Sequence, residues 1–144
     1  MRRRLVPVWF AILTLAILLL PTSAAASGGY HYTVLSDRCS RPFGFTNNLK
    51  VIESAAGTTH ANRLTIDSSA QEYFASDPHP HWITMHTWSQ VSNTFPVDGT
   101  SHSLTLHRSY LGGNIEQAGR IVFRLRAWHN TTVLWNTTVK STIC

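Results

Sequence analysis

The stretch that decides the fold lies between Ile121 and Ile143 and reads IVFRLRAWHNTTVLWNTTVKSTI. In its first half every second residue is apolar, and the residues between include two arginines and a tryptophan. After the turn residues His129 and Asn130 the alternation resumes. Because successive side chains of a strand point to opposite faces, this pattern predicts an antiparallel hairpin. The residues expected to face inward are Ile121, Phe123, Leu125, Ala127, Val133, Trp135, Val139 and Ile143.

Shorter runs of strand-forming residues precede this hairpin, separated by turn signals such as Asp77-Pro78 and Gly112-Gly113-Asn114. The run Cys39–Asn48 is turn-like and is expected to be a connection. Seven or eight short strands predict an all-β chain folded as an antiparallel two-sheet sandwich of the immunoglobulin-like type. A small β-barrel is the alternative. The strand candidates are Tyr30–Leu35, Leu49–Glu53, Arg63–Asp67, Gln71–Phe74, Trp82–Trp88, Ser103–Arg108, Ile121–Trp128 and Thr132–Ile143.

The first 26 residues have the order of a secretory signal peptide. A basic head of three arginines precedes the apolar run Leu5–Leu20, and small residues follow at Ala24–Ala26. We expect cleavage after Ala26, which leaves residues 27–144 as a single secreted or cell-surface domain that meets a membrane only during export. The alternative is an uncleaved anchor, but a spanning helix needs about 20 apolar residues and this run is shorter.

Removal of this segment changes the charge of the chain. The formal net charge is +5 with histidine neutral, and three of the twelve basic residues lie in the segment. Nine basic and seven acidic residues remain, a net charge of +2. The eight histidines would raise this value in acid surroundings. A charge this small predicts no nucleic-acid partner.

Cys39 and Cys144 are the two cysteines of the chain. In an oxidising compartment an even pair predicts one disulfide, here closing a loop of about 105 residues. The alternative, a redox-active thiol pair, needs closely spaced cysteines, and these two lie far apart in the sequence.

One strand candidate carries aromatic side chains on a single face. In Trp82–Trp88, strict alternation places Trp82, His86 and Trp88 on one side and the apolar Ile83 and Met85 on the other, which we take as the core face. Exposed aromatic rings anchor ligands and protein partners. These residues therefore predict a surface that binds a glycan or an extracellular protein. The alternative is that one tryptophan fills the core.

A row of outward residues on the decisive stretch extends this prediction. Arg124, Arg126 and Trp128 alternate with the inward residues, and Arg120 precedes them. Arginines beside an indole can stack on it and can bind carboxylate, phosphate or sulfate. The alternative is the solvated face of an edge strand, where charges prevent pairing with other chains. From the aromatic strand and this arginine row together, we expect a binding module that needs no cofactor.

A histidine-rich segment offers a second hypothesis. His79 and His81 are two residues apart, so both side chains can point the same way in an extended chain, and His86 would join them only through a partner strand or a turn. Imidazole suits copper and zinc, and the thioether of Met85 would favour reduced copper. The alternative is a rigid exposed loop, since prolines flank His79.

The final hairpin also contains two acceptor sequences for N-linked glycans. Asn130-Thr131-Thr132 and Asn136-Thr137-Thr138 are sequons, so Asn130 and Asn136 would carry glycans in a host that glycosylates asparagine. Otherwise they belong to a threonine-rich strand.

The sequence contains no nucleophile-elbow, zinc-protease or phosphate-loop motif and no closely spaced carboxylate pair. We expect a protein that is not an enzyme, with a small secreted hydrolase as a third hypothesis.

Overall fold

The computed structural model describes residues 29–40, 44–53, 60–76, 78–111 and 118–144. The signal segment predicted for residues 1–26 lies outside these ranges, as do Asp77 and the turn signal at residues 112–114. The described residues form seven strands. They are β1 (Tyr30–Ser40), β2 (Gly44–Glu53), β3 (Arg63–Phe74), β4 (His81–Thr94), β5 (His102–Tyr110), β6 (Ala118–His129) and β7 (Thr132–Lys140).

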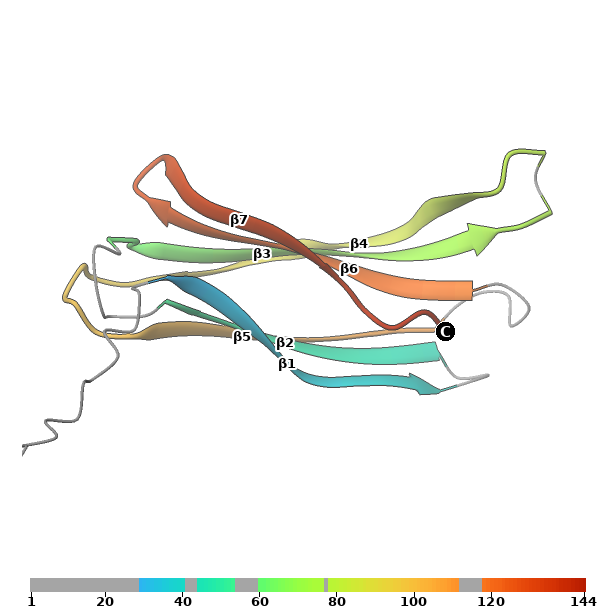
Figure 1. The fold of residues 1–144 in the computed structure, drawn as a ribbon, viewed down its shortest axis with the longest axis horizontal. Coiled ribbons are helices and arrows are strands. Elements are labelled where there is room, and N and C mark those ends of the chain that lie inside the picture. Colours follow the sequence, from blue (N-terminus) through green and yellow to red (C-terminus); the bar gives the residue numbers. More distant parts are fainter. Residues whose placement is uncertain (1–28, 41–43, 54–59, 77, 112–117) are drawn as a thin grey trace, which may run out of the picture.

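The strands make two antiparallel sheets that pack face to face as a sandwich (Figure 1). The three-stranded sheet has the order β1-β2-β5, and the four-stranded sheet has the order β4-β3-β6-β7. The sheets do not close into a barrel. The predicted all-β sandwich is therefore confirmed. In the immunoglobulin-like plan the fourth strand can belong to either sheet, and here it pairs with β3.

The core lies between the sheets and is built by the alternation of the decisive stretch. The inward residues of β6 are fully buried, and β6 lies between β3 and β7 in the four-stranded sheet. Truncation of Phe123 to alanine would cost about 3–5 kcal/mol, because the void could not close fully. Trp135 packs against this cluster, as expected. The core residues are Leu49, Val51, Ala61, Leu64, Ile66, Phe95, Leu104, Leu106, Ile121, Phe123, Leu125, Ala127 and Val139.

An expected connection and an expected gap between two strand candidates are strand in the structure. The run Cys39–Asn48 belongs largely to β1 and β2, which pair directly. Two of its asparagines form hydrogen bonds across the strands, since the Asn48 amide donates to the Ser36 hydroxyl at 2.7 Å and the Asn47 amide to the Asp37 carboxylate at 3.1 Å. Likewise the two short candidates at residues 63–67 and 71–74 are one continuous strand, β3.

The inward pattern expected for β7 is wrong at its two ends. The pairing of β6 with β7 shifts beside Ala127, so that Val133 stands opposite Trp128 and not between the sheets. Val133 is 39 % exposed as a result. Ile143 lies beyond the end of β7 and is 57 % exposed.

Residues 141–144 continue along β6 and then reach the other sheet. The backbone N–H groups of Ser141 and Cys144 donate to carbonyls of β6 at 2.8 Å. Cys144 forms the predicted disulfide with Cys39 of β1, with 5.5 Å between the two Cα atoms. The staple thus joins the two sheets, because β1 belongs to one and the chain after β7 lies against the other.

Candidate binding face

One of the two interruptions in the pairing of β4 with β3 breaks the alternation expected for Trp82–Trp88. Thr84 and His86 pair with adjacent residues of β3, so Met85 between them is an extra residue. A bulge of one residue sends the side chains on either side of it to opposite faces. Met85, which we expected in the core, is 44 % exposed, and Ile83, also expected there, pairs with the buried Glu72 but is itself 37 % exposed.

The expectation that Trp82, His86 and Trp88 share one face is therefore wrong. His86 and Trp88 pair with Ala70 and Ser68, which are buried between the sheets. Trp82, on the other side of the bulge, points to the outer face of the four-stranded sheet. The predicted aromatic surface of β4 is divided between two sides of the molecule.

His86 and Trp88 belong to an aromatic cluster at the margin of the core. The His86 ring lies 4.8 Å from Trp88 and 6.2 Å from Tyr110, centroid to centroid. The Arg108 guanidinium stands 5.5 Å over Trp88, and its Nε donates to the Ser68 hydroxyl at 3.0 Å. Burial lowers the pKa of Arg108 and raises the pKa of Tyr110. These contacts join β3, β4 and β5, so the cluster supports the sandwich.

Trp128 lies on the outer face and is held there by three neighbours. Its indole Nε1 donates a 2.9 Å hydrogen bond to the hydroxyl of Thr65, which is only 2 % exposed. The guanidinium groups of Arg63 and Arg126 stand 4.9 and 5.6 Å from its ring. Arg126 in turn forms a 2.6 Å ion pair with Asp67. These contacts together orient the indole on the outer face.

Trp82 forms a second platform at the other end of the same face. The Arg120 guanidinium lies 3.8 Å over its ring, and the Tyr73 ring lies 5.3 Å away at a tilt. The Arg120 Nε donates to Gln71 at 2.9 Å, and the Gln71 amide donates to Thr84 at 3.4 Å. Burial lowers the pKa of Arg120. This platform, like the first, combines an indole with an oriented arginine.

Two adjacent hollows lie between the platforms and share Arg124 and Thr138. The larger has a volume of about 460 Å³ and the smaller about 210 Å³. Arg63, opposite Trp128, and Tyr73, opposite Trp82, are ten positions apart on β3, which corresponds to about 33 Å of extended strand. We call this outer surface of β4, β3, β6 and β7 the platform face. The hollows are lined by Asp67, Ser68, Ser69, Thr84, Thr87, Val122, Arg124, Arg126, Val133, Asn136 and Thr138.

The structure brings together four of the six residues predicted to bind a partner. Trp82, Arg124, Arg126 and Trp128 lie on the platform face, whereas His86 and Trp88 do not. The interpretation of the arginine row as an edge strand is wrong, because β6 pairs on both sides. The sequence analysis missed the contributions of β3: Arg63, Asp67, Gln71 and Tyr73. Their alternation with Leu64 and Ile66 places them outward, but only the pairing of β3 with β6 sets them beside the tryptophans.

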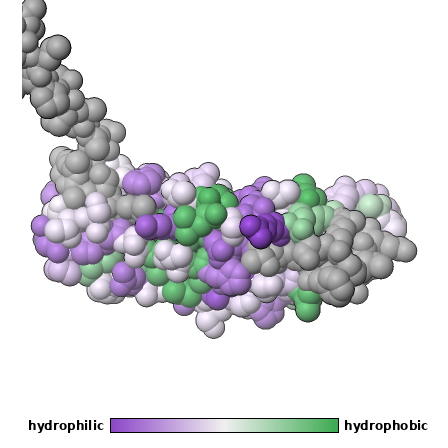
Figure 2. All heavy atoms as spheres, turned by 90° about the horizontal axis from the view of Figure 1, so that it is seen from below, coloured by the Kyte–Doolittle hydropathy of each residue, from purple (hydrophilic) through white to green (hydrophobic). Residues whose placement is uncertain are grey.

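The opposite surface of the molecule has a different character. Figure 2 shows the sandwich from below, on the side of the three-stranded sheet, with apolar spots scattered among polar side chains. Its β5 alternates as predicted, with Leu104 and Leu106 buried and Thr105 and His107 exposed. The arginine contacts of Trp82 and Trp128 lie on the platform face of the other sheet.

The histidine segment shows no assembled metal site in the described part of the chain. There, no three histidine, cysteine, aspartate or glutamate side chains are placed to hold one ion. The His81 Nδ1 is 2.6 Å from the carbonyl oxygen of His79, so one ring nitrogen is engaged locally. His86 takes part in the aromatic cluster instead. Copper or zinc binding by His79, His81 and His86 stays a prediction from the sequence.

The two sequon asparagines have different surroundings. Asn130 occupies the turn between β6 and β7 with a positive φ of 53°. Its Oδ1 accepts from the Asn62 amide at 2.8 Å, and its backbone N–H donates to Asn62 Oδ1 at 2.9 Å. Asn136 is exposed on β7 and lines the larger hollow. A glycan at Asn136 would therefore stand on the platform face.

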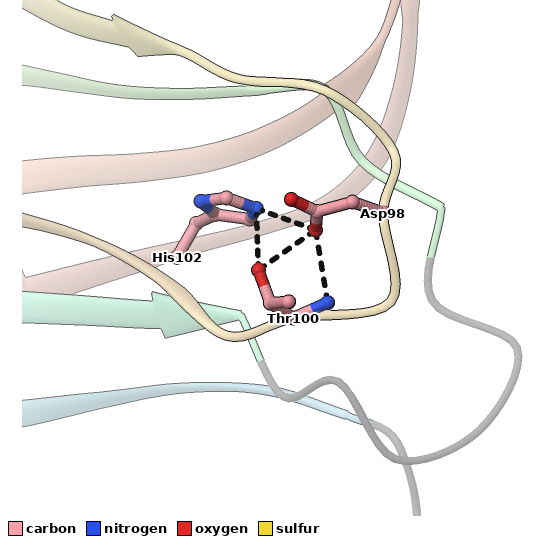
Figure 3. Close-up of polar contacts among 3 residues, drawn as sticks. All are labelled: Asp98, Thr100 and His102. Carbon is pink, nitrogen blue, oxygen red and sulfur yellow. Dashed lines mark hydrogen bonds and ion pairs between the residues drawn. The ribbon is translucent and has the colours of Figure 1, made fainter.

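A compact polar cluster stabilises the connection between β4 and β5 (Figure 3). The hydroxyl and backbone N–H of Thr100 donate to one Asp98 oxygen at 2.7 and 2.9 Å, and His102 Nε2 is 3.0 Å from that oxygen. Mainly through the Thr100 hydroxyl, these contacts lower the pKa of Asp98 to about 2. The His102 ring stacks on Phe95 at 4.0 Å. All three polar groups converge on one carboxylate oxygen, so the cluster orders the turn.

Comparison with known proteins yields no family. No family model matches the chain, and no curated protein matches it in sequence. Spo0M, a sporulation control protein from Bacillus subtilis, has 10 % identity and a TM-score of 0.39 over 78 % of this chain and 47 % of that chain. A β-glucosidase from Kluyveromyces marxianus in complex with glucose has 8 % identity and a TM-score of 0.37 over 81 % of this chain and 14 % of that chain. The chain spans less than half the length of each.

Two structural facts bear on the compartment. The disulfide between Cys39 and Cys144 is compatible with an oxidising, extracellular location. Among the residues that the structure describes, none forms a helix with the length and apolar character needed to cross a membrane.

Proposed function

We propose that the protein is a secreted binding module that recognises a glycan through the platform face. The observation that carries this proposal is the pair of arginine-backed indoles, Trp82 and Trp128, on one sheet surface with two hollows between them. An indole offers a broad apolar surface with one polar edge. The C–H face of a sugar ring is complementary to such a surface.

The lining of the hollows supports a carbohydrate ligand. Between the indoles stand the hydroxyls of Ser69, Thr84, Thr87 and Thr138 and the guanidinium of Arg124. Short hydroxyl side chains both donate and accept hydrogen bonds, as sugar hydroxyls do. The lining therefore suits a ligand that presents hydroxyls in both roles.

The same face is poorly suited to a protein partner. The cores of protein interfaces are apolar and depleted of charged residues, with large anchors clustered near the centre. Here the centre holds Arg124 and the ion pair of Arg126 with Asp67, while the indoles lie at the two ends. An elongated ligand with repeated rings can contact both ends, whereas a compact protein patch would have to bury charges.

The two indoles are also held in place by neighbouring side chains. Trp128 is held by Thr65 and Trp82 by Arg120, and each support is itself hydrogen-bonded or buried. A ligand that binds such a surface loses less free energy to ordering of side chains. This preorganisation supports a role in recognition.

The proposal is tested by measuring carbohydrate binding. The full 144-residue chain is expressed, the purified product is screened against immobilised oligo- and polysaccharides, and hits are titrated by calorimetry. We expect Trp82→Ala and Trp128→Ala each to weaken binding about tenfold or more. Tyr32→Ala is the matched control, because Tyr32 is an aromatic residue 43 % exposed on β1, away from the platform face.

Three outcomes would overturn the proposal. These are absence of carbohydrate binding, equal loss in Tyr32→Ala, and tight binding of an extracellular protein that survives both tryptophan substitutions. Thermal unfolding of each variant shows whether a loss of binding merely reflects a loss of folded protein.

A further inference from the structure

The platform face concentrates the positive charge of the molecule. Five cationic side chains point outward from β3, β6 and β7, against one described carboxylate, that of Asp67. Within the described ranges the face has a net charge of +4, whereas the other charged side chains, three basic and four acidic, sum to −1. The field of the domain is therefore strongly one-sided. The five cations are Arg63, Arg120, Arg124, Arg126 and Lys140.

The single carboxylate does not neutralise the face. Asp67 uses one oxygen to pair with Arg126 at 2.6 Å and the other to accept from the Gln90 amide at 2.7 Å. Arg63 and Arg120 stack on the indoles, which orients their guanidinium groups and leaves their charge in place. Four cations beyond the ion pair remain to attract an anion.

Arg124 occupies the centre of this arrangement. It is exposed, it lines both hollows, and within the described ranges no carboxylate forms an ion pair with it. A guanidinium presents a planar set of N–H donors that matches a carboxylate, sulfate or phosphate group in a two-pronged geometry. The hollows thus have an anion-binding group where the two meet.

From these observations we infer that the ligand of the platform face is an anionic polysaccharide, one whose sugar rings carry carboxylate, sulfate or phosphate groups. The inference rests on the proposed function and adds the chemical class of the glycan. The indoles stack on sugar rings near the two ends, and Arg124 with Lys140 holds anionic groups between them. The span of about 33 Å between the platforms requires a polymer and not a single sugar.

A single-stranded nucleic acid also combines rings with negative charge, but the face fits it less well. Such strands are bound by aromatic side chains that stack successive bases along a basic groove. Here two indoles stand at opposite ends, and the surface between them is lined by hydroxyls. The anionic sugar polymer satisfies the hydroxyls, the cations and both indoles together.

The test uses matched polymers that differ only in charge. The purified protein is titrated with polygalacturonate and its methyl ester, and with dextran sulfate and dextran. We expect at least one acidic form to bind about tenfold or more tightly than its neutral counterpart in 50 mM salt. That preference should fall steeply by about 500 mM salt, because screening shortens the reach of exposed charges.

Charge-matched variants separate a site from general attraction. Arg124→Gln should weaken binding of the acidic polymer about tenfold and remove most of its preference over the neutral polymer. Lys50→Gln removes the same charge from β2 in the other sheet and should change the affinity less than twofold. Equal effects of the two substitutions would overturn the inference.

The remaining outcomes distinguish this inference from the proposed function. Equal binding of acidic and neutral polymers through Trp82 and Trp128 would overturn the anionic class and leave glycan recognition standing. Tighter binding of oligo-dT than of any polysaccharide would overturn the anionic polysaccharide in favour of a nucleic acid. Absence of binding to all polysaccharides would overturn both.

Discussion

One carboxylate oxygen of Asp37 accepts hydrogen bonds from both the backbone N–H and the hydroxyl of Thr142, at 2.6 and 2.8 Å. The two residues are 105 positions apart in the sequence and two positions away from the disulfide between Cys39 and Cys144. The polar contact and the covalent bond together tie β1 to the segment that follows β7. The two ties therefore act at the same junction between the sheets.

Replacement of both cysteines by serine should lower the free energy of unfolding by about 2–5 kcal/mol. In the chain-entropy model, the disulfide stabilises by restricting the unfolded chain, and its loop is long. Guanidinium chloride unfolding monitored by tryptophan fluorescence measures the change. An unchanged midpoint in the double variant would contradict this prediction.

In a double-mutant cycle, Asp37→Ala should couple to the cysteine changes by about 0.5 kcal/mol or more, because the two ties share one junction.

Thr65→Val should destabilise the protein by about 1–3 kcal/mol, although the side chains have nearly the same shape. The substitution removes the hydroxyl that accepts the Trp128 indole N–H and leaves that donor without its partner. We also expect weaker glycan binding, because the platform loses one of its supports. Chemical unfolding and calorimetric titration test the two effects separately. The control is Thr87→Val, an exposed threonine on the same face, for which a stability change within about 0.5 kcal/mol is expected.

The pKa of Asp98 should be measurable at about 2 in the folded protein, against an ordinary value of 3.8. Because the folded-state pKa is depressed, the stabilisation is present above pH 3.8 and is lost as the pH falls through 2. Carboxyl-carbon NMR over this pH range gives the value. Thr100→Val removes the hydroxyl that contributes most to the shift, so it should raise the pKa of Asp98. A pKa of Asp98 that does not move in this variant would refute the geometry of Figure 3.

Glycosylation at Asn136 should block the platform face. In a host that occupies both sequons, we expect the secreted protein to lose glycan binding, because Asn136 lines the larger hollow. Asn136→Gln should restore binding in that host. Thr132→Ala removes the other sequon without changing Asn130, and it should not restore binding. Mass spectrometry establishes occupancy, and full binding by a protein glycosylated at Asn136 would contradict the placement of the site.

The core strands were predictable because their pattern is local. In β6 the residues Ile121, Phe123, Leu125 and Ala127 alternate with polar neighbours, and burial follows directly from the period of a strand. The hairpin with β7 followed from the turn at Asn130, where a positive φ is readily adopted by asparagine. The disulfide followed from counting cysteines in a chain expected to be exported.

The candidate site was only partly predictable, because bulges and strand pairing are tertiary features. The extra residue at Met85 places Trp82 and Trp88 on opposite faces, and neither residue type nor spacing reveals it. The pairing of β3 with β6 brings Arg63 to Trp128 and Asp67 to Arg126, across 65 and 59 positions of sequence. These contacts form only once the strands have chosen their neighbours.

The sequence by itself determined that the chain forms strands, that β6 buries its apolar side and that Cys39 can pair with Cys144. These properties depend on the alternation of neighbouring side chains and on the chemistry of two thiols. The tertiary structure alone decided that β6 is a central strand and that Trp82 and Trp128 share one face. Which face a side chain occupies depends on the register between strands, and the register is set by packing across the whole sandwich.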